Sequence, residues 1–132
     1  MLQDINGVPV RDEPHMRVAS IITREQIIAI QREMRTALLA YRNRHGNEPF
    51  AVFHIFGGVN TDWPHENLAV AALTRAYEER YRGDRARARR AASLAAGRIF
   101  KWVLWRDNLT YRIDHREIFR DGRARTFYRV VE

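Results

Sequence analysis

Cysteine is absent from this 132-residue sequence. Without a thiol the chain can form neither a disulfide framework nor a cysteine-ligated zinc finger, and a cysteine nucleophile is excluded as well. No run of apolar residues is long enough to span a bilayer. Residues 1–16 also lack the apolar core of a signal peptide. We therefore expect a cytoplasmic protein with no membrane partner.

Motifs of the common catalytic centres are missing too. The sequence contains no G-x-S-x-G, no Walker loop and no H-E-x-x-H, and its five histidines do not show metal-ligand spacing. Asp114 and His115 are adjacent, and adjacent side chains on a strand point to opposite faces, so Asp114 is not expected to orient His115 as a general base. We expect no enzyme, no metal site and no cofactor. A small metal-free nuclease built on His54 or His115 is the least favoured alternative.

The chain is expected to form a single α+β domain over residues 23–132, preceded by an arm over residues 1–22. The arm contains glycine and proline and shows no sustained apolar period. Its last residues, 18–22, are apolar enough to add a short strand. No internal repeat, low-complexity tract or linker divides the chain.

Three helices are predicted from their caps and apolar spacing. Thr23 and Gln26 have the form of a capping box at the start of the first helix. An aspartate caps each of the other two helices, and a glycine follows the end of all three. The predicted ranges are about 24–45, the segment between Asp62 and Gly83, and 85–96, which ends before Gly97.

Strands are predicted in two places. Residues 50–56 are apolar and rich in aromatic side chains, which is typical of a buried strand. Residues 98–131 are predicted to form a three-stranded antiparallel meander with turns at 107–108 and 121–122. Its pairing leaves Glu117 on the apolar face unless a bulge re-aims this part of the strand. The expected apolar face of its second hairpin consists of Tyr111, Ile113, His115, Tyr128 and Val130, and Lys101 is expected opposite Asp114.

The same residues allow a second interpretation. If the third helix ran on to about residue 105, the order would be helix, strand, helix, helix, strand, strand. This order resembles that of winged helix-turn-helix DNA-binding domains, with Asp121-Gly122 at the tip of the wing. The meander is preferred because two turns independently select one apolar face.

Positive charge is concentrated in one segment. The chain carries 23 basic and 16 acidic residues, and 22 of the basic residues are arginine. Residues 82–106 contain eight basic residues and a single acidic one, Asp84. The net charge of this segment is therefore +7, the same as that of the whole chain. Clustered charge of this kind predicts an anionic partner, and arginine is suited to phosphate.

The densest part of this segment is the predicted helix 85–96. Its alanines form one narrow stripe that lets the helix lie close to its support, while four arginines occupy the remaining surface. Guanidinium groups this close repel one another unless an anion lies between them, and a phosphate backbone supplies that anion. The candidate nucleic-acid-binding residues are Arg82, Arg85, Arg87, Arg89 and Arg90 around this helix, and Arg120, Arg123 and Arg125 in the C-terminal hairpin.

The arginines of the hairpin are weaker evidence for nucleic-acid binding than those of the helix. Arg116, Arg125 and Arg129 are expected on one polar face together with Phe127. The exposed side of a half-buried antiparallel sheet is normally polar. These arginines therefore support binding only if the hairpin and the helix share a surface.

The favoured function is a non-catalytic protein that grips the backbone of DNA or RNA through the helix 85–96, with the hairpin as a second contact. The alternative is a structural or interaction component of a phage- or plasmid-type assembly. Such a component would bind an acidic protein surface, or another copy of itself, through Trp63 and Trp105, because tryptophan is enriched at protein interfaces.

Overall fold

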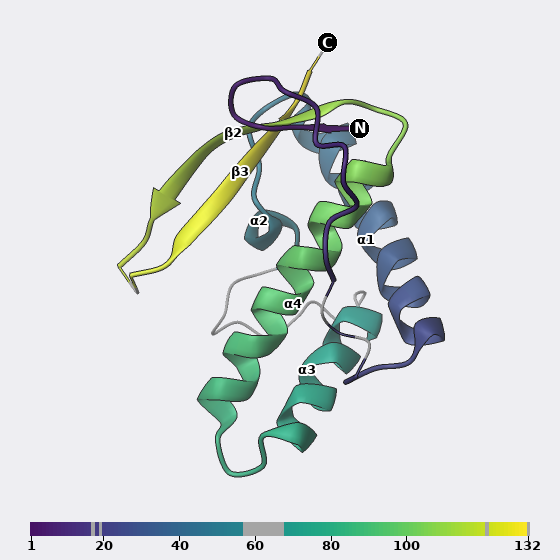
Figure 1. Ribbon diagram of the computed structural model, residues 1–132, viewed down its shortest axis with the longest axis vertical. Coiled ribbons are helices and arrows are strands. Elements are labelled where there is room, and N and C mark those ends of the chain that lie inside the picture. The colour runs from purple at the N-terminus through teal and green to yellow at the C-terminus, as the bar shows by residue number, and fades with distance from the viewer. Residues whose placement is uncertain (17, 19, 57–67, 121, 132) are drawn as a thin grey trace.

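The computed structural model describes residues 1–16, 18, 20–56, 68–120 and 122–131. Within these residues, helices and a three-stranded mixed sheet give the predicted α+β class. Figure 1 shows the sheet and both chain ends at one end of the molecule, and the turn between α3 and α4 at the other. The elements are β1 (Leu2–Gln3), α1 (Arg24–His45), α2 (Val52–Phe56), α3 (Leu68–Arg80), α4 (Arg85–Arg106), β2 (Tyr111–Ile118) and β3 (Ala124–Val130).

The first residues of the chain belong to the sheet. The strand order is β1-β2-β3, with β1 parallel to β2 and β2 antiparallel to β3. Leu2 and Val18 are both buried in the core, so the segment predicted as an arm is packed against the domain. The described residues of 18–22 form a turn and not the short strand considered for them.

The first helix begins and ends where its caps predict. The Thr23 hydroxyl accepts a hydrogen bond from the Gln26 amide, and the Gln26 side chain accepts one from the Thr23 amide. Gly46 follows the last turn with a positive φ of 66°, a conformation that glycine adopts without steric cost. The buried face of α1 consists of Ile30, Met34 and Leu38.

The helices α3 and α4 form an antiparallel pair and lie side by side in Figure 1. The cap predicted at Asp62 lies outside the described residues. Gly83 adopts a positive φ after α3, and the Asp84 side chain accepts a hydrogen bond from the Arg87 amide at 3.1 Å. The predicted glycine stop after α3 and the predicted aspartate cap of α4 are therefore confirmed.

The first strand of the meander predicted over 98–131 is wrong, because α4 continues to Arg106. Gly97 does not have a positive φ and lies within the helix. Beyond it, four buried residues continue the apolar stripe at helical spacing: Ile99, Phe100, Val103 and Leu104. Their burial outweighs the roughly 1 kcal/mol that an interior glycine costs a helix relative to alanine. The turn predicted at 107–108 is therefore the end of α4, and Lys101 does not lie opposite Asp114.

The long helix agrees with the second interpretation of the sequence, but two other features depart from a winged helix-turn-helix. Residues 52–56 are helical, and Phe50 alone pairs with Tyr128 as an isolated bridge. The early strand of the fold is therefore β1 and not 50–56. In addition, α3 and α4 run antiparallel to each other, whereas the helices of a helix-turn-helix cross steeply.

The C-terminal hairpin is present, with a register that differs from the predicted one. Phe119 donates a backbone hydrogen bond to Arg123 at the end of the hairpin. Asp121, the first residue of the predicted turn, lies outside the described residues. Ile113 pairs with Tyr128, whereas His115 pairs with Phe127, so the register shifts at Asp114.

This bulge decides which side chains share a face of the hairpin. Tyr111, Ile113, Tyr128 and Val130 are buried together as predicted. His115 instead stacks on Phe127, with 4.5 Å between the ring centroids. Beyond the bulge, cross-strand partners share a face, and Glu117 pairs with Arg125 while Arg116 pairs with Thr126. Glu117 is thus removed from the apolar face, and Arg116 is separated from Arg125.

Candidate functional site

The first half of α4 presents arginines to solvent above a buried alanine stripe. Ala88, Ala92 and Ala95 have no exposed surface. Arg85, Arg87 and Arg90 are exposed, and Arg89 is half-buried. This is the arrangement that the sequence predicts for the helix.

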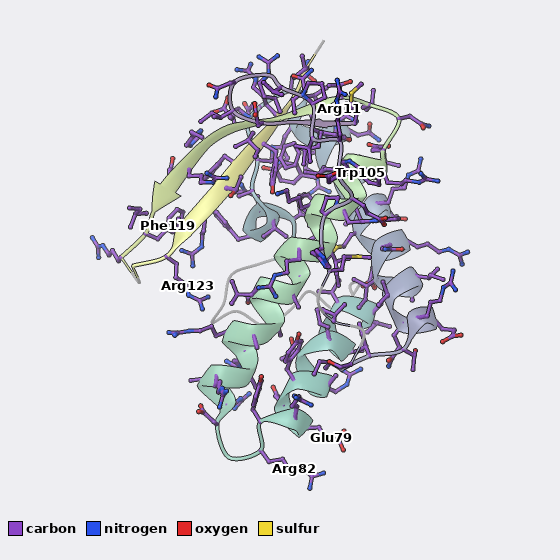
Figure 2. The ribbon with its side chains drawn as sticks, viewed as in Figure 1. Arg11, Glu79, Arg82, Trp105, Phe119 and Arg123 are labelled. Atoms are coloured by element: carbon purple, nitrogen blue, oxygen red, sulfur yellow. The ribbon has the colours of Figure 1, made fainter. Side chains whose placement is uncertain are left out.

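Two of the predicted arginines have partners near the start of α4. The guanidinium carbon of Arg87 lies 4.3 Å from the centroid of the Tyr81 ring. Arg82 pairs with Glu79 at 3.3 Å (Figure 2), and both side chains are largely exposed. Exposed pairs of this kind contribute little to stability, so Arg82 can exchange Glu79 for another anion at low cost.

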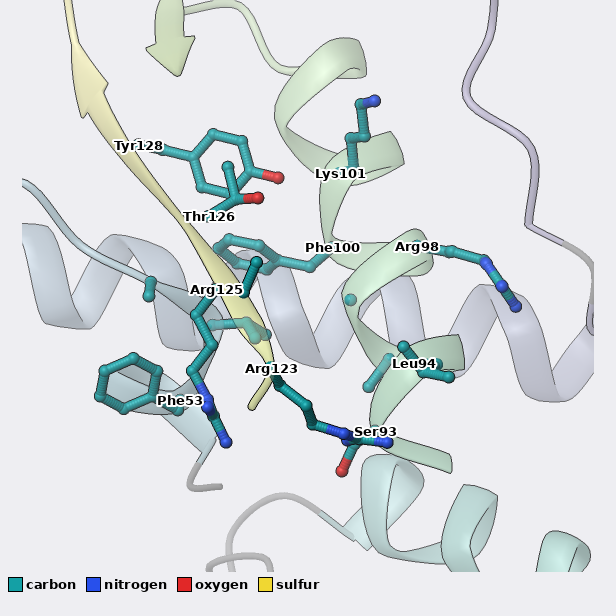
Figure 3. Close-up of a pocket in the computed structure, with 15 residues that line it drawn as sticks. Phe53, Ser93, Leu94, Arg98, Phe100, Lys101, Arg123, Arg125, Thr126 and Tyr128 are labelled. Carbon is teal, nitrogen blue, oxygen red and sulfur yellow. The ribbon is translucent and has the colours of Figure 1, made fainter. Parts of the chain in front are cut away.

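A cleft of about 480 Å³ lies between the second half of α4 and the C-terminal hairpin. One wall is α4 from Ser93 to Lys101, and the other is formed by α2 and by the start of β3 with Arg123 before it (Figure 3). The helix and the hairpin therefore share a surface. This was the condition under which the arginines of the hairpin would support the predicted function.

The charged side chains that line the cleft, among the residues the structure describes, are all basic: Arg98, Lys101, Arg123 and Arg125. Figure 3 shows Arg123 reaching from the hairpin toward Ser93 of α4, and Arg125 extending beside Phe53. Arg98 points away from β3, so it contributes its stem to the wall and not its charge.

Aromatic rings support Arg125 at this edge of the cleft. Its guanidinium carbon lies 4.3 Å from the centroid of the Phe119 ring. That ring packs edge-on against Phe53 at 5.4 Å, and Phe53 packs against Phe127 at 5.9 Å. A cation held over an aromatic face keeps its charge and its planar donors while it loses conformational freedom. The stack therefore holds the guanidinium of Arg125 at the edge of the cleft.

The structure does not bring all of the predicted binding residues together. Arg123 and Arg125 line the cleft, whereas Arg82, Arg85 and Arg87 lie at the far end of α4, and Arg120 is exposed in the hairpin loop. Arg89 and Arg90 precede Ser93 and Leu94 by one turn, so they continue the wall of the cleft toward the start of the helix.

Sequence reasoning missed the α4 wall of the cleft. Ser93, Gly97 and Lys101 follow one another at four-residue intervals and line the cleft. Gly97 was interpreted as a helix stop, which placed Lys101 on a strand. The signal that could have found this wall was the apolar period, which continues unbroken from Ala88 to Leu104.

His115 is held by two carboxylates, contrary to the expectation that Asp114 could not orient it. Its Nδ1 lies 2.5 Å from Asp114 Oδ2, and its Nε2 lies 2.9 Å from Glu117 Oε1. The bulge at Asp114 breaks the strict alternation of strand side chains and brings the neighbouring groups together. The hydrogen bond to Asp114, followed by that to Glu117, raises the pKa of His115 above its ordinary value. Because both ring nitrogens are engaged, His115 would have to give up a carboxylate to act on a substrate.

His54 also packs against Phe127, in an edge-on arrangement with 5.6 Å between the ring centroids. Its Nδ1 accepts a hydrogen bond from the Ala51 amide at 2.9 Å, and burial lowers its pKa. Among the residues described, no group of three histidine, aspartate or glutamate side chains is arranged to hold a metal ion.

Trp105 is half-buried and contacts residues before the first helix. Its indole nitrogen donates a hydrogen bond to the Val10 carbonyl at 2.9 Å. Trp102 likewise donates to Glu13, at 2.6 Å. Trp63 lies outside the described residues. Trp105, expected at a partner interface, thus donates its indole N–H to the chain itself.

Comparison with known proteins adds no relative to this description. No model of a protein family matches the chain, no curated protein matches it, and no solved structure matches it. In the described part of the chain, no helix is long and apolar enough to cross a membrane. The winged-helix resemblance, already weakened by the helix at 52–56, gains no support from these comparisons, and the function is argued from the residues of the cleft and of α4.

Proposed function

We propose that this protein binds nucleic acid without catalysing a reaction, through a surface that extends from the arginines of α4 into the cleft beside the hairpin. The observation that carries the proposal is the cleft itself, because it joins basic side chains of α4 and β3 on one surface. The net charge of the segment 82–106 and the position of Arg123 and Arg125 thereby support one binding surface instead of two.

The chemistry of this surface favours phosphate. Arg85, Arg87 and Arg90 are exposed in the first two turns of α4. Exposed arginines release the counterions of a phosphate backbone when they bind it, and they donate paired hydrogen bonds to its oxygens. Such contacts carry no sequence information by themselves, so we expect affinity for many sequences.

Titrations with duplex DNA, single-stranded DNA and RNA at several salt concentrations test this proposal. The affinity should fall steeply with salt, with a log–log slope of about −4 on duplex DNA if four or five phosphates are neutralised. Replacing Arg85, Arg87, Arg89 and Arg90 together by alanine should remove most of this slope. Replacing Arg123 and Arg125 by alanine should weaken binding further, because these residues belong to the same surface.

The matched control removes two arginines elsewhere. Arg24 and Arg44 are exposed on α1, and replacing both by alanine changes the net charge by the same amount as the hairpin variant. This control should bind nearly as well as the original chain. Equal losses in both double variants would mean that net charge alone drives binding. Absence of affinity at low salt, or full affinity of the quadruple variant, would instead favour the assembly component with an acidic partner.

A further inference from the structure

The fold of the isolated chain does not require a glycine at position 97. Gly97 lies inside α4 without a positive φ, and a Cβ built at this position would meet no atom within 4 Å apart from the backbone of its own helix. Neither the backbone conformation nor the packing of the chain therefore excludes a side chain here. Glycine in a helix interior destabilises the helix relative to alanine. Since Gly97 lines the cleft, the space that it leaves open is available to a ligand.

The wall around Gly97 suits a ligand that is flat and apolar in part. Ser93 and Gly97 are small and leave space on the helix side of the cleft, and the half-exposed Leu94 lies beside this space. Val52 and Phe53 face them from α2. A phosphate backbone by itself follows an exposed surface and has no use for an apolar recess, whereas a nucleobase buries its faces in one.

The charged side chains define the other part of the ligand. Arg123 reaches across the mouth of the cleft toward Ser93, and Arg125 is held over Phe119 beside it. A group bound against Gly97 would lie next to guanidinium donors that match the oxygens of a phosphate. The cleft thus offers an apolar recess and an anion site within the dimensions of one nucleotide, and its volume of about 480 Å³ is in the range of small-molecule sites.

We propose that the cleft receives one unpaired nucleotide of a bound strand, with its base against Gly97 and Phe53 and its phosphate at Arg123 and Arg125. This inference rests on the proposed function and adds a preference for single strands or for duplexes with an extrahelical base. A paired base cannot enter the recess without being flipped out of its stack, which costs free energy. The arginines at the start of α4 would bind the flanking backbone in either case.

The experiment compares three ligands of equal length: oligothymidylate, the same strand with abasic sites, and a duplex. The original chain should bind oligothymidylate about tenfold more tightly than the abasic strand, since stacking of a base contributes on this scale. Gly97→Leu fills the recess and should abolish this difference, while affinity for the abasic strand and the duplex stays unchanged. Ala40→Leu, at an exposed position of α1, adds the same bulk outside the cleft and should keep the difference.

Gly97→Ala provides an independent variant that folds well. We expect its melting temperature to rise by about 3 °C, because alanine is the better helix former. Its preference for oligothymidylate over the abasic strand should nevertheless decrease. A gain in stability combined with a loss of base-dependent affinity would not arise from a purely structural role of Gly97.

The outcomes separate this inference from the proposed function. If folded Gly97→Leu and Gly97→Ala prefer oligothymidylate as the original chain does, the cleft does not hold a base, and salt-dependent backbone binding still stands. The same conclusion follows if the original chain does not distinguish oligothymidylate from the abasic strand. If no nucleic acid binds, both proposals fail, and an apolar segment of a protein partner becomes the candidate occupant of the cleft.

Discussion

The carboxylate of Glu33, in α1, accepts a hydrogen bond from the backbone amide of Val70 at 2.8 Å and a second from Ala69 at 3.1 Å. These are amides of the first turn of α3, which have no partner within their own helix. A negative charge at this end of a helix is also stabilised by the helix dipole. Glu33 therefore ties α1 to α3 through a cap supplied by another helix.

Removing this cap should destabilise the chain. We expect Glu33→Gln to lower the free energy of unfolding by about 1 kcal/mol, and Glu33→Ala by about 2 kcal/mol, because alanine leaves the amides without an acceptor. Urea denaturation followed by circular dichroism measures both values. Glu48→Gln, at an exposed position outside the helices, is the control and should have almost no effect. Equal stability of Glu33→Ala and the original chain would show that water replaces the cap without loss.

The hydrogen bonds of His115 to Asp114 and Glu117 predict a dependence of stability on pH. They raise its pKa in the folded chain above the ordinary value of 6.5. The charged imidazolium therefore stabilises the fold fully below about pH 6.5, and this contribution is lost as the pH rises through the higher, folded pKa. Urea midpoints measured across this window should fall with pH in the original chain. This part of the decrease should be missing in His115→Gln.

An NMR titration tests whether His115 is the source of this pH dependence of stability. The His115 signals should titrate above pH 6.5 and those of His54 below it, since burial lowers the pKa of His54. Asp114→Asn should move the His115 titration downward. His15→Gln, which changes an exposed histidine, should retain the pH dependence of the original chain. A His115 midpoint at or below 6.5 would contradict the hydrogen-bonded pair with Asp114.

Trp105 should hold the segment around Val10 against the end of α4. Trp105→Phe keeps an aromatic ring but removes the indole donor, so the Val10 carbonyl loses its hydrogen bond. We expect a loss of about 1 kcal/mol in unfolding free energy, together with faster amide hydrogen exchange around residues 8–12. Trp102→Phe removes the bond to Glu13 instead, so its faster exchange should centre further along the chain. Unchanged exchange in Trp105→Phe would mean that packing alone holds the segment.

Arg87 and Arg90 should respond differently to the same substitution. Arg87 lies over the Tyr81 ring, whereas Arg90 is exposed further along the helix. We expect Arg87→Ala to lower the unfolding free energy by about 0.5–1 kcal/mol, and Arg90→Ala to leave it almost unchanged. Each should reduce the salt slope of DNA binding by about one if it contacts a phosphate. If a variant changes stability but leaves the salt slope of DNA binding unchanged, its arginine does not belong to the proposed surface.

Local signals in the sequence determined the boundaries of several elements. The capping box of Thr23 and Gln26, and the glycine-aspartate pair at 83–84, act through neighbouring backbone groups and need no distant partner. The exposed arginines and buried alanines of the first half of α4 likewise follow from helical periodicity. The class of the fold and the candidate arginines were predictable for this reason.

Tertiary packing decided what local preference left open. Residues 99–106 are helical because their apolar stripe is buried in the core, and this outweighs the interruption at Gly97. The bulge at Asp114 fits the start of β2 to the core while turning His115 and Glu117 away from it.

The cleft depends both on the continuation of α4 beyond Gly97 and on the bulge at Asp114. A helix that ended at residue 96 would lack the part of the cleft wall from Gly97 to Lys101, and an unshifted hairpin would pair different side chains. The sequence by itself determined which residues carry the charge, because composition and period are local properties. Only the tertiary structure decided which of them share a surface, because the distance between α4 and β3 depends on how their side chains pack across the core.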